Sequence, residues 1–164
     1  MEYHPLPQPE EVTQREREDA MGSYFMMFAT TAIGLPMPII NMIAAIVYYY
    51  VNKSKGRYVQ FHTLQSLYSQ IPVTALNLVL VVWLLRNLFK DFMFTNMFWG
   101  FLAMTLLANL IYFAFSIVAA VRANKGRFYY FMFFGKLAYH VVYKKDGNFE
   151  SAGEMEPVNK APKM

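Results

Sequence analysis

Residues 58–85 read YVQFHTLQSLYSQIPVTALNLVLVVWLL and carry no formal charge. Two further uncharged stretches lie on either side, at residues 20–52 and 92–121. Each exceeds the roughly 20 apolar residues with which a helix crosses about 30 Å of hydrocarbon. A helix satisfies its own backbone N–H and C=O groups, so such runs are typical of transmembrane helices. A soluble bundle of this size would bury one such helix but not three. The sequence therefore predicts an all-α, polytopic integral membrane protein.

The charges are unevenly distributed along the 164 residues, of which 56% are hydrophobic and only 16% charged. The first 19 residues hold six acids and two bases, whereas Asp91 is the only acid between Ala20 and Lys145. There is no cysteine, which excludes disulfides and cysteine-based metal sites. The scarcity of acids removes the paired carboxylates that acid–base catalysis uses. We therefore expect no enzymatic activity, no cofactor and no bound metal.

The membrane domain is expected at residues 20–143, with four hydrophobic helices. One helix over the first uncharged stretch would extend to about 50 Å, too long without strong tilt. Pro36 and Pro38 each lack an N–H and disfavour helical angles in the preceding residue. We expect a hairpin of two short helices there, with one kinked span as the alternative. The four helices are predicted at about 20–34, 37–51, 58–85 (with a further break at Pro72) and 97–121.

A fifth helix, at 128–143, is predicted to lie in the plane of the membrane interface because it is amphipathic. Its polar stripe would comprise Lys136, His140, Tyr143 and Lys144, opposite Phe134, Ala138, Val141 and Val142. The flanking tails are predicted to be disordered. They are an acidic, proline-rich tail at 1–19 and a mixed-charge tail at 144–164.

Basic residues gather in two loops, at residues 53–57 and 122–127, and in the segment that follows the second loop. A Lys-Gly-Arg sequence followed by aromatic residues occurs at 55–61 and again at 125–131. The simple interpretation is a glycine ending a helix in the left-handed conformation, and a duplication is the alternative. The positive-inside rule places both loops and both termini in the cytoplasm, with an external N-terminus as the alternative. We expect lipid headgroups to meet the basic side chains, which are Lys53, Lys55, Arg57, Arg122, Lys125, Arg127 and Lys136.

Polar side chains form a strip along each of the last two spans. We favour the interpretation that the strips meet and hydrogen-bond, as polar residues do between membrane helices. A hydrated pathway and a face for a partner's helix are the alternatives. His62 has no acid partner in sight, which favours a structural role. The strips comprise His62, Gln65, Ser66, Ser69, Gln70 and Asn77 on the third helix, and Thr105, Asn109 and Ser116 on the fourth.

Two segments resemble a known family. Residues 57–67, RYVQFHTLQSL, are similar to the R-F-H-x-x-Q-[SA]-L signature of the Tic-twenty-like family. Residues 116–126, SIVAAVRANKG, are similar to the end of the last span in its bacterial members. The plant members belong to the protein-import machinery of the chloroplast inner envelope, and the bacterial members are small membrane proteins of unknown function. The resemblance implies a four-helix layout and a bacterial cytoplasmic (inner) membrane location, with another membrane as the alternative.

Together these observations suggest a non-enzymatic subunit of a complex for protein translocation or membrane-protein assembly. Its expected partners are lipids and other membrane subunits or further copies of the chain, and no nucleic acid. The alternative is a small self-associating channel or transporter for ions or solutes, with a polar path including His62, Gln65 and Asn109. A lipid-organising scaffold, suggested by the aromatic residues at 128–134, is a third possibility.

Overall fold

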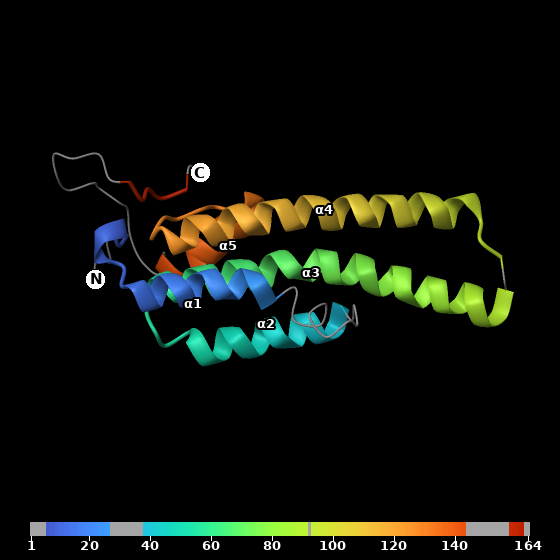
Figure 1. Ribbon diagram of the computed structural model, residues 1–164, viewed down its shortest axis with the longest axis horizontal. Coiled ribbons are helices and arrows are strands. Elements are labelled where there is room, and N and C mark those ends of the chain that lie inside the picture. The colour runs from blue at the N-terminus through green and yellow to red at the C-terminus, as the bar shows by residue number, and fades with distance from the viewer. Residues whose placement is uncertain (1–5, 27–37, 92, 144–157, 163–164) are drawn as a thin grey trace.

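The computed structural model describes residues 6–26, 38–91, 93–143 and 158–162. Within these residues the chain forms five α-helices and no strand (Figure 1). Helices α3 (Arg57–Arg86) and α4 (Asn96–Asn124) form a long hairpin, and a π-helical turn, η4 (Asn87–Asp91), follows α3. The shorter helices pack around one part of this hairpin. They are α1 (Gln14–Phe25), α2 (Pro38–Asn52) and α5 (Met132–Tyr143).

The two hairpin helices are the part of the structure that indicates a membrane protein. The continuous helix from Arg57 to Lys90 and helix α4 are long and apolar enough to cross a membrane. Only 6% and 17% of their most apolar windows are buried inside the protein, whereas a core helix of a soluble protein is mostly buried. The expected all-α fold is confirmed. Of the four expected spans, two are helices long and apolar enough to cross a membrane. Helix α2, with 15 residues, extends only about 22 Å.

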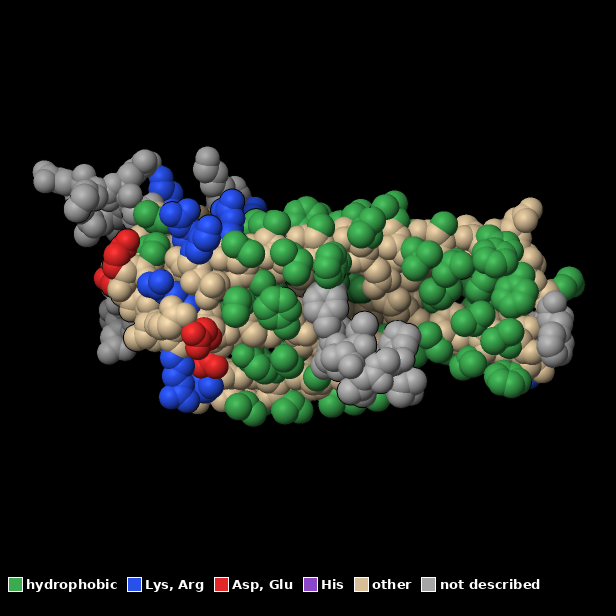
Figure 2. All heavy atoms as spheres, viewed as in Figure 1, with side chains coloured by type: hydrophobic (Ala, Val, Ile, Leu, Met, Phe, Trp, Pro, Cys, Tyr) green, Lys and Arg blue, Asp and Glu red, His purple; other side chains and the backbone are tan. Residues whose placement is uncertain are grey.

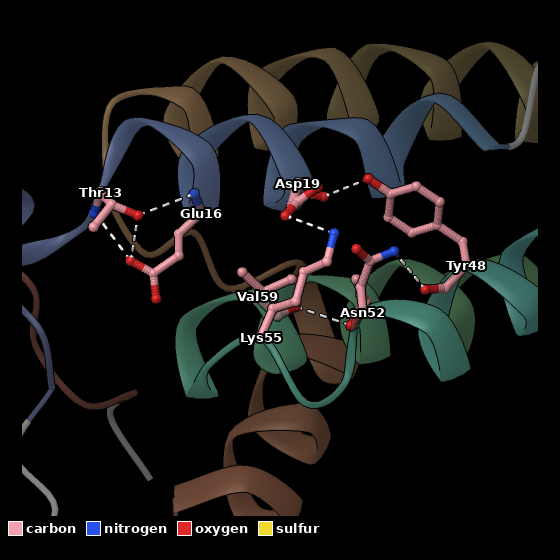
Figure 3. Close-up of polar contacts among 8 residues, drawn as sticks. Thr13, Glu16, Asp19, Tyr48, Asn52, Lys55 and Val59 are labelled. Atoms are coloured by element: carbon pink, nitrogen blue, oxygen red, sulfur yellow. Dashed lines mark hydrogen bonds and ion pairs between the residues drawn. The ribbon is translucent and has the colours of Figure 1, made fainter.

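Helix α1 begins at Gln14, six residues before the first expected helix. A capping box starts it: Thr13 Oγ1 accepts from Glu16 N at 3.3 Å, and the Glu16 carboxylate accepts from Thr13 N at 3.0 Å (Figure 3). Such a reciprocal cap satisfies backbone donors that a helix start leaves open. The expectation of disorder throughout residues 1–19 is therefore wrong for this part of the tail.

The three prolines expected to break helices have different outcomes. Pro38 is the first residue of α2, where a missing N–H removes no helical bond. Pro72 lies inside α3, which continues unbroken, so the break expected there is wrong. Membrane helices tolerate proline where neighbouring groups satisfy the freed backbone. Pro36 and the end of the helix expected at 20–34 lie in residues 27–37, outside the described residues.

Helix α5 packs on α3 rather than presenting the expected stripe. Its buried face comprises Gly135, Ala138, Tyr139, Val142 and Tyr143. Tyr143 is therefore buried instead of lying on an exposed polar stripe. This change follows from the aromatic core, because the Tyr143 ring packs against Phe61 and Phe128. Lys144 lies outside the described residues.

Charged side chains gather at the end of the molecule where α3 begins and α4 ends (Figure 2). We call this end the polar head; it comprises residues 6–26, 52–66, 119–143 and 158–162. Most of the buried hydrophobic core lies here, between α1, the start of α3, the end of α4 and α5. Burial raises the pKa of Tyr130 and Tyr143, so both head phenols are neutral at physiological pH.

One asparagine joins three segments of the polar head. Asn159 Nδ2 donates to Pro7 O at 2.6 Å and to Gly126 O at 3.0 Å, and its Oδ1 accepts from Phe128 N at 2.9 Å. Gly126 has the expected left-handed φ of 69°, whereas Gly56, with a φ of 130°, is the N-cap of α3 instead of the end of a helix. This part of the C-terminal tail is thus packed, whereas the disorder expected for 144–157 lies outside the described residues.

Candidate functional site

A hydrogen-bonded network crosses the polar head and centres on Gln65, which is fully buried in α3. Its Oε1 accepts from the backbone N–H of Phe131 at 3.1 Å. Because a backbone N–H only donates, this contact fixes which end of the Gln65 amide is oxygen. The Nε2 atom of Gln65 therefore donates to the Tyr24 hydroxyl, at 2.6 Å. Gln65 thereby links α1, α3 and the segment before α5.

The orientation of Gln65 also sets the state of His62. The Tyr24 hydroxyl lies 2.9 Å from His62 Nδ1. This hydroxyl accepts from Gln65, and His62 Nδ1 is the one acceptor within reach of its own proton among the described residues, so we assign Nδ1 as the acceptor. His62 is then the neutral tautomer with its proton on Nε2. That atom has no hydrogen-bond partner among the described residues, and the rings of Tyr58, Phe61 and Phe128 surround the imidazole at 4.6, 4.9 and 5.7 Å between centroids.

The serines of the third helix also bond mostly away from α4. Ser66 Oγ donates to Ser23 O in α1 at 2.8 Å. Ser69 Oγ donates to Ser66 O at 2.9 Å, and a 3.5 Å contact to the Tyr112 hydroxyl joins it to α4. Of the residues singled out from the sequence, His62 and Gln65 are therefore joined through Tyr24 of α1. Ser66 bonds separately to α1, whereas Ser69 bonds within α3 and to α4.

The two polar strips meet most directly at Asn77 and Asn109. Each amide donates to the other's Oδ1 at 3.0 Å. The Nδ2 atoms also donate to Val73 O and Thr105 O, each at 2.8 Å. This reciprocal pair joins α3 to α4 in the apolar part of the hairpin. Three other strip residues are buried with side-chain atoms that have no hydrogen-bond partner among the described residues, namely Gln70, Thr105 and Ser116.

We expect the Asn77–Asn109 pair to stabilise the hairpin measurably. In a double-mutant cycle with N77A and N109A, the coupling free energy should be about 0.6 to 1.7 kcal/mol, the range found between membrane helices. The measurement is reversible unfolding in mixed micelles. A cycle pairing N77A with L107A is the control, because Leu107 is 58% exposed. Equal coupling in both cycles would contradict the pair's role.

The basic residues singled out from the sequence are all exposed at the polar head. Lys55 Nζ forms an ion pair with Asp19 at 3.0 Å, and Tyr48 donates to the backbone oxygen of Asp19 at 2.8 Å (Figure 3). These contacts hold α1 against the end of α2. Lys53 and Arg122 lie over the rings of Tyr50 and Tyr129. The remaining basic residues of this set, also exposed, are Arg57, Lys125, Arg127 and Lys136.

Sequence reasoning missed the partners of the buried polar residues. Tyr24 and Tyr112 look like ordinary members of apolar runs, and Phe131 contributes only its backbone N–H. Gly135 was also missed, although a Cβ there would lie 2.7 Å from Gln65 Oε1 and 2.5 Å from Tyr130 Cα. The one available signal was the phenol itself, since a buried tyrosine hydroxyl usually finds a hydrogen-bond partner.

The geometry offers a rigid, hydrogen-bonded head on a membrane hairpin. A family model described as the magnetosome magnetite crystal formation protein family (MamF/MmsF) matches residues 18–138. No curated protein and no solved structure matches the chain significantly.

This match overturns the expected relationship to the Tic-twenty-like family and the expected role in protein translocation or assembly. The segments that suggested the relationship, residues 57–67 and 116–126, form a helix start with its buried polar residues and the end of a span. Those are structural features that unrelated helical membrane proteins share. With its match extending from α1 into α5, the chain belongs to the magnetosome magnetite crystal formation protein family.

Proposed function

We propose that this protein is a non-enzymatic, integral membrane component that takes part in magnetite crystal formation. The family match over residues 18–138 carries this proposal, because it includes both apolar helices and most of the polar head. The exposed apolar surface of α3 and α4 supports insertion in the magnetosome membrane. The buried network around Gln65 supports a structural role, because it fixes the helices of the head relative to the hairpin.

We assign contacts with partners to the polar head. At the opposite end, the exposed side chains around the turn are mostly apolar, including Leu88, Phe89, Met93 and Phe94. The head instead exposes acids such as Glu10 and Glu18 together with the basic residues. Such a surface suits lipid headgroups and charged faces of other membrane proteins or of further copies of this chain.

We further propose two full spans, α3 and α4, with the head on the cytoplasmic side. The positive-inside rule supports this side, because the head carries most of the basic residues. The charges in the first half of α1 and the short length of α2 support two spans rather than four. Both termini then lie on the cytoplasmic side.

Single cysteines test this arrangement cleanly, because the chain contains none. We expect E10C and K160C to react with a membrane-impermeant maleimide only after the cytoplasmic side is opened. M93C, in the exposed turn, should react from the other side. Labelling of all three positions from one side would contradict the two-span hairpin.

Deleting the gene in its source organism tests the function. We expect fewer or smaller magnetite crystals in electron micrographs, restored by the wild-type gene. A double variant, E10Q/E18Q, should restore them less well than K90Q, the matched change at the turn. Unchanged crystals after deletion would refute the function, and failure of K90Q alone would refute the assignment to the head.

A further inference from the structure

A small polar cavity lies between α2, α3 and α4, apart from the network around Gln65. Its volume is about 60 Å³, and its lining includes Asn41, Gln70, Thr74, Asn77, Asn109 and Tyr112. Pro38, the first residue of α2, lies at its edge. Gln70 is the 14th of the 30 residues of α3, so it lies about 20 Å from the start of the helix. The cavity is therefore near the middle of the hairpin, where α2 begins (Figure 1).

Gln70 is the side chain that this cavity leaves unsatisfied. It is only 3% exposed, yet neither its Oε1 nor its Nε2 has a hydrogen-bond partner among the described residues. The Tyr112 hydroxyl lies close enough to Gln70 to interact with it electrostatically, but the two side chains form no hydrogen bond of good geometry. An unsatisfied amide in hydrocarbon costs several kcal/mol. A polar gap of this kind is where a bridging molecule is expected.

The hydrogen-bonding groups determine which molecule fits. Gln70 offers two N–H donors and one acceptor oxygen. Asn77 and Asn109 have used both N–H groups, so each adds only a remaining lone pair. The described lining carries no formal charge, so an anion or a cation would be uncompensated at this depth.

We propose that this cavity is a water site inside the membrane. Water both donates and accepts, so it can bridge Gln70 to the free lone pairs of the asparagine pair and to Tyr112. A water needs about 10 to 15 Å³ of such space and two to four polar partners, and the cavity supplies both. The same water lies next to the first turn of α2.

X-ray hydroxyl-radical footprinting of the purified full chain in lipid nanodiscs tests this site, because radicals form from water next to the modified side chain. We expect Tyr112 to be oxidised several-fold faster than Phe113, its neighbour, which is 43% exposed on the outer surface of the hairpin. Supplying H₂¹⁸O shows whether the added oxygen comes from water. Equal oxidation of the two residues would mean a dry cavity and would overturn the proposal.

Two substitutions confirm that the water is held by this cavity. Q70L replaces the unsatisfied amide by an apolar side chain of similar size, and T74V removes a hydroxyl from the lining with little change in shape. Each should lower Tyr112 oxidation toward that of Phe113, while circular dichroism reports the helical fold. Unchanged oxidation in both folded variants would place the water elsewhere and refute the site.

Discussion

Replacing Gly135 by alanine, which adds a single methyl group, should strongly destabilise the polar head. The added Cβ would lie 2.5 Å from Tyr130 Cα and 2.8 Å from its carbonyl carbon. Backbone atoms cannot rotate away as a side-chain tip can, so α5 has to move. The Cβ would also lie 2.7 Å from Gln65 Oε1, which accepts the Phe131 bond. We expect a loss of about 3 kcal/mol, the upper end for overpacked cores, or about 10 °C in Tm.

Gly100 supplies the matched control, because it lies on the exposed surface of α4 with nothing within 4 Å of an added Cβ. G100A should be neutral or stabilising by up to about 1 kcal/mol, since alanine favours helices more than glycine does. Thermal unfolding of both variants in the same detergent is the measurement. If G135A were as stable as G100A, α5 would not be packed as described.

The substitution Q65L should have a comparable effect for a different reason. Leucine fills the space of the amide but leaves the buried Phe131 N–H without an acceptor and the Tyr24 hydroxyl without its donor. Leaving buried groups unsatisfied costs about 1 to 3 kcal/mol each, so we expect a loss of about 3 kcal/mol in unfolding free energy. Hydrogen exchange at Phe131 should also accelerate, because its protecting bond is gone.

The control for this substitution is Q60L, on the same helix, where the glutamine is only partly buried. It should change the unfolding free energy by less than about 0.5 kcal/mol, as surface substitutions usually do. Exchange at Phe131 should stay slow in Q60L. A Q65L protein as stable as Q60L would show that the network contributes nothing to the head.

The sequence was informative where one physical requirement dominates. Long uncharged runs leave few alternatives to membrane helices, so α3 and α4 could be located from composition alone. The basic side chains of the two loops could likewise be expected on the surface, and they are exposed. Asn77 and Asn109 were singled out because an amide in an apolar run needs a partner, and the structure joins these two.

The remaining features depend on long-range contacts that a single sequence does not contain. The charges of α1 suggested a disordered tail, because the capping box of Thr13 and the packing of Ala20 on the core become visible only in three dimensions. Pro72 suggested a break that the surrounding helix tolerates. The partner of His62 is Tyr24, 38 residues away, and no periodicity relates them. The resemblance to the Tic-twenty-like family was wrong. Its residues, 57–67 and 116–126, pack helices together and do not define a chemical activity.

The contacts of Asn159 have a consequence for biosynthesis. This residue, five positions from the C-terminus, bonds to Pro7 near the N-terminus and to Gly126. The hairpin can enter the membrane while the chain is still being translated, but these contacts form only after residue 159 has been synthesised. The head is therefore completed after both apolar helices are available for insertion. A chain truncated after α5 would keep both apolar helices but lose the bonds of Asn159 to Pro7 O and Gly126 O, so we expect residues near Pro7 to become more sensitive to proteases.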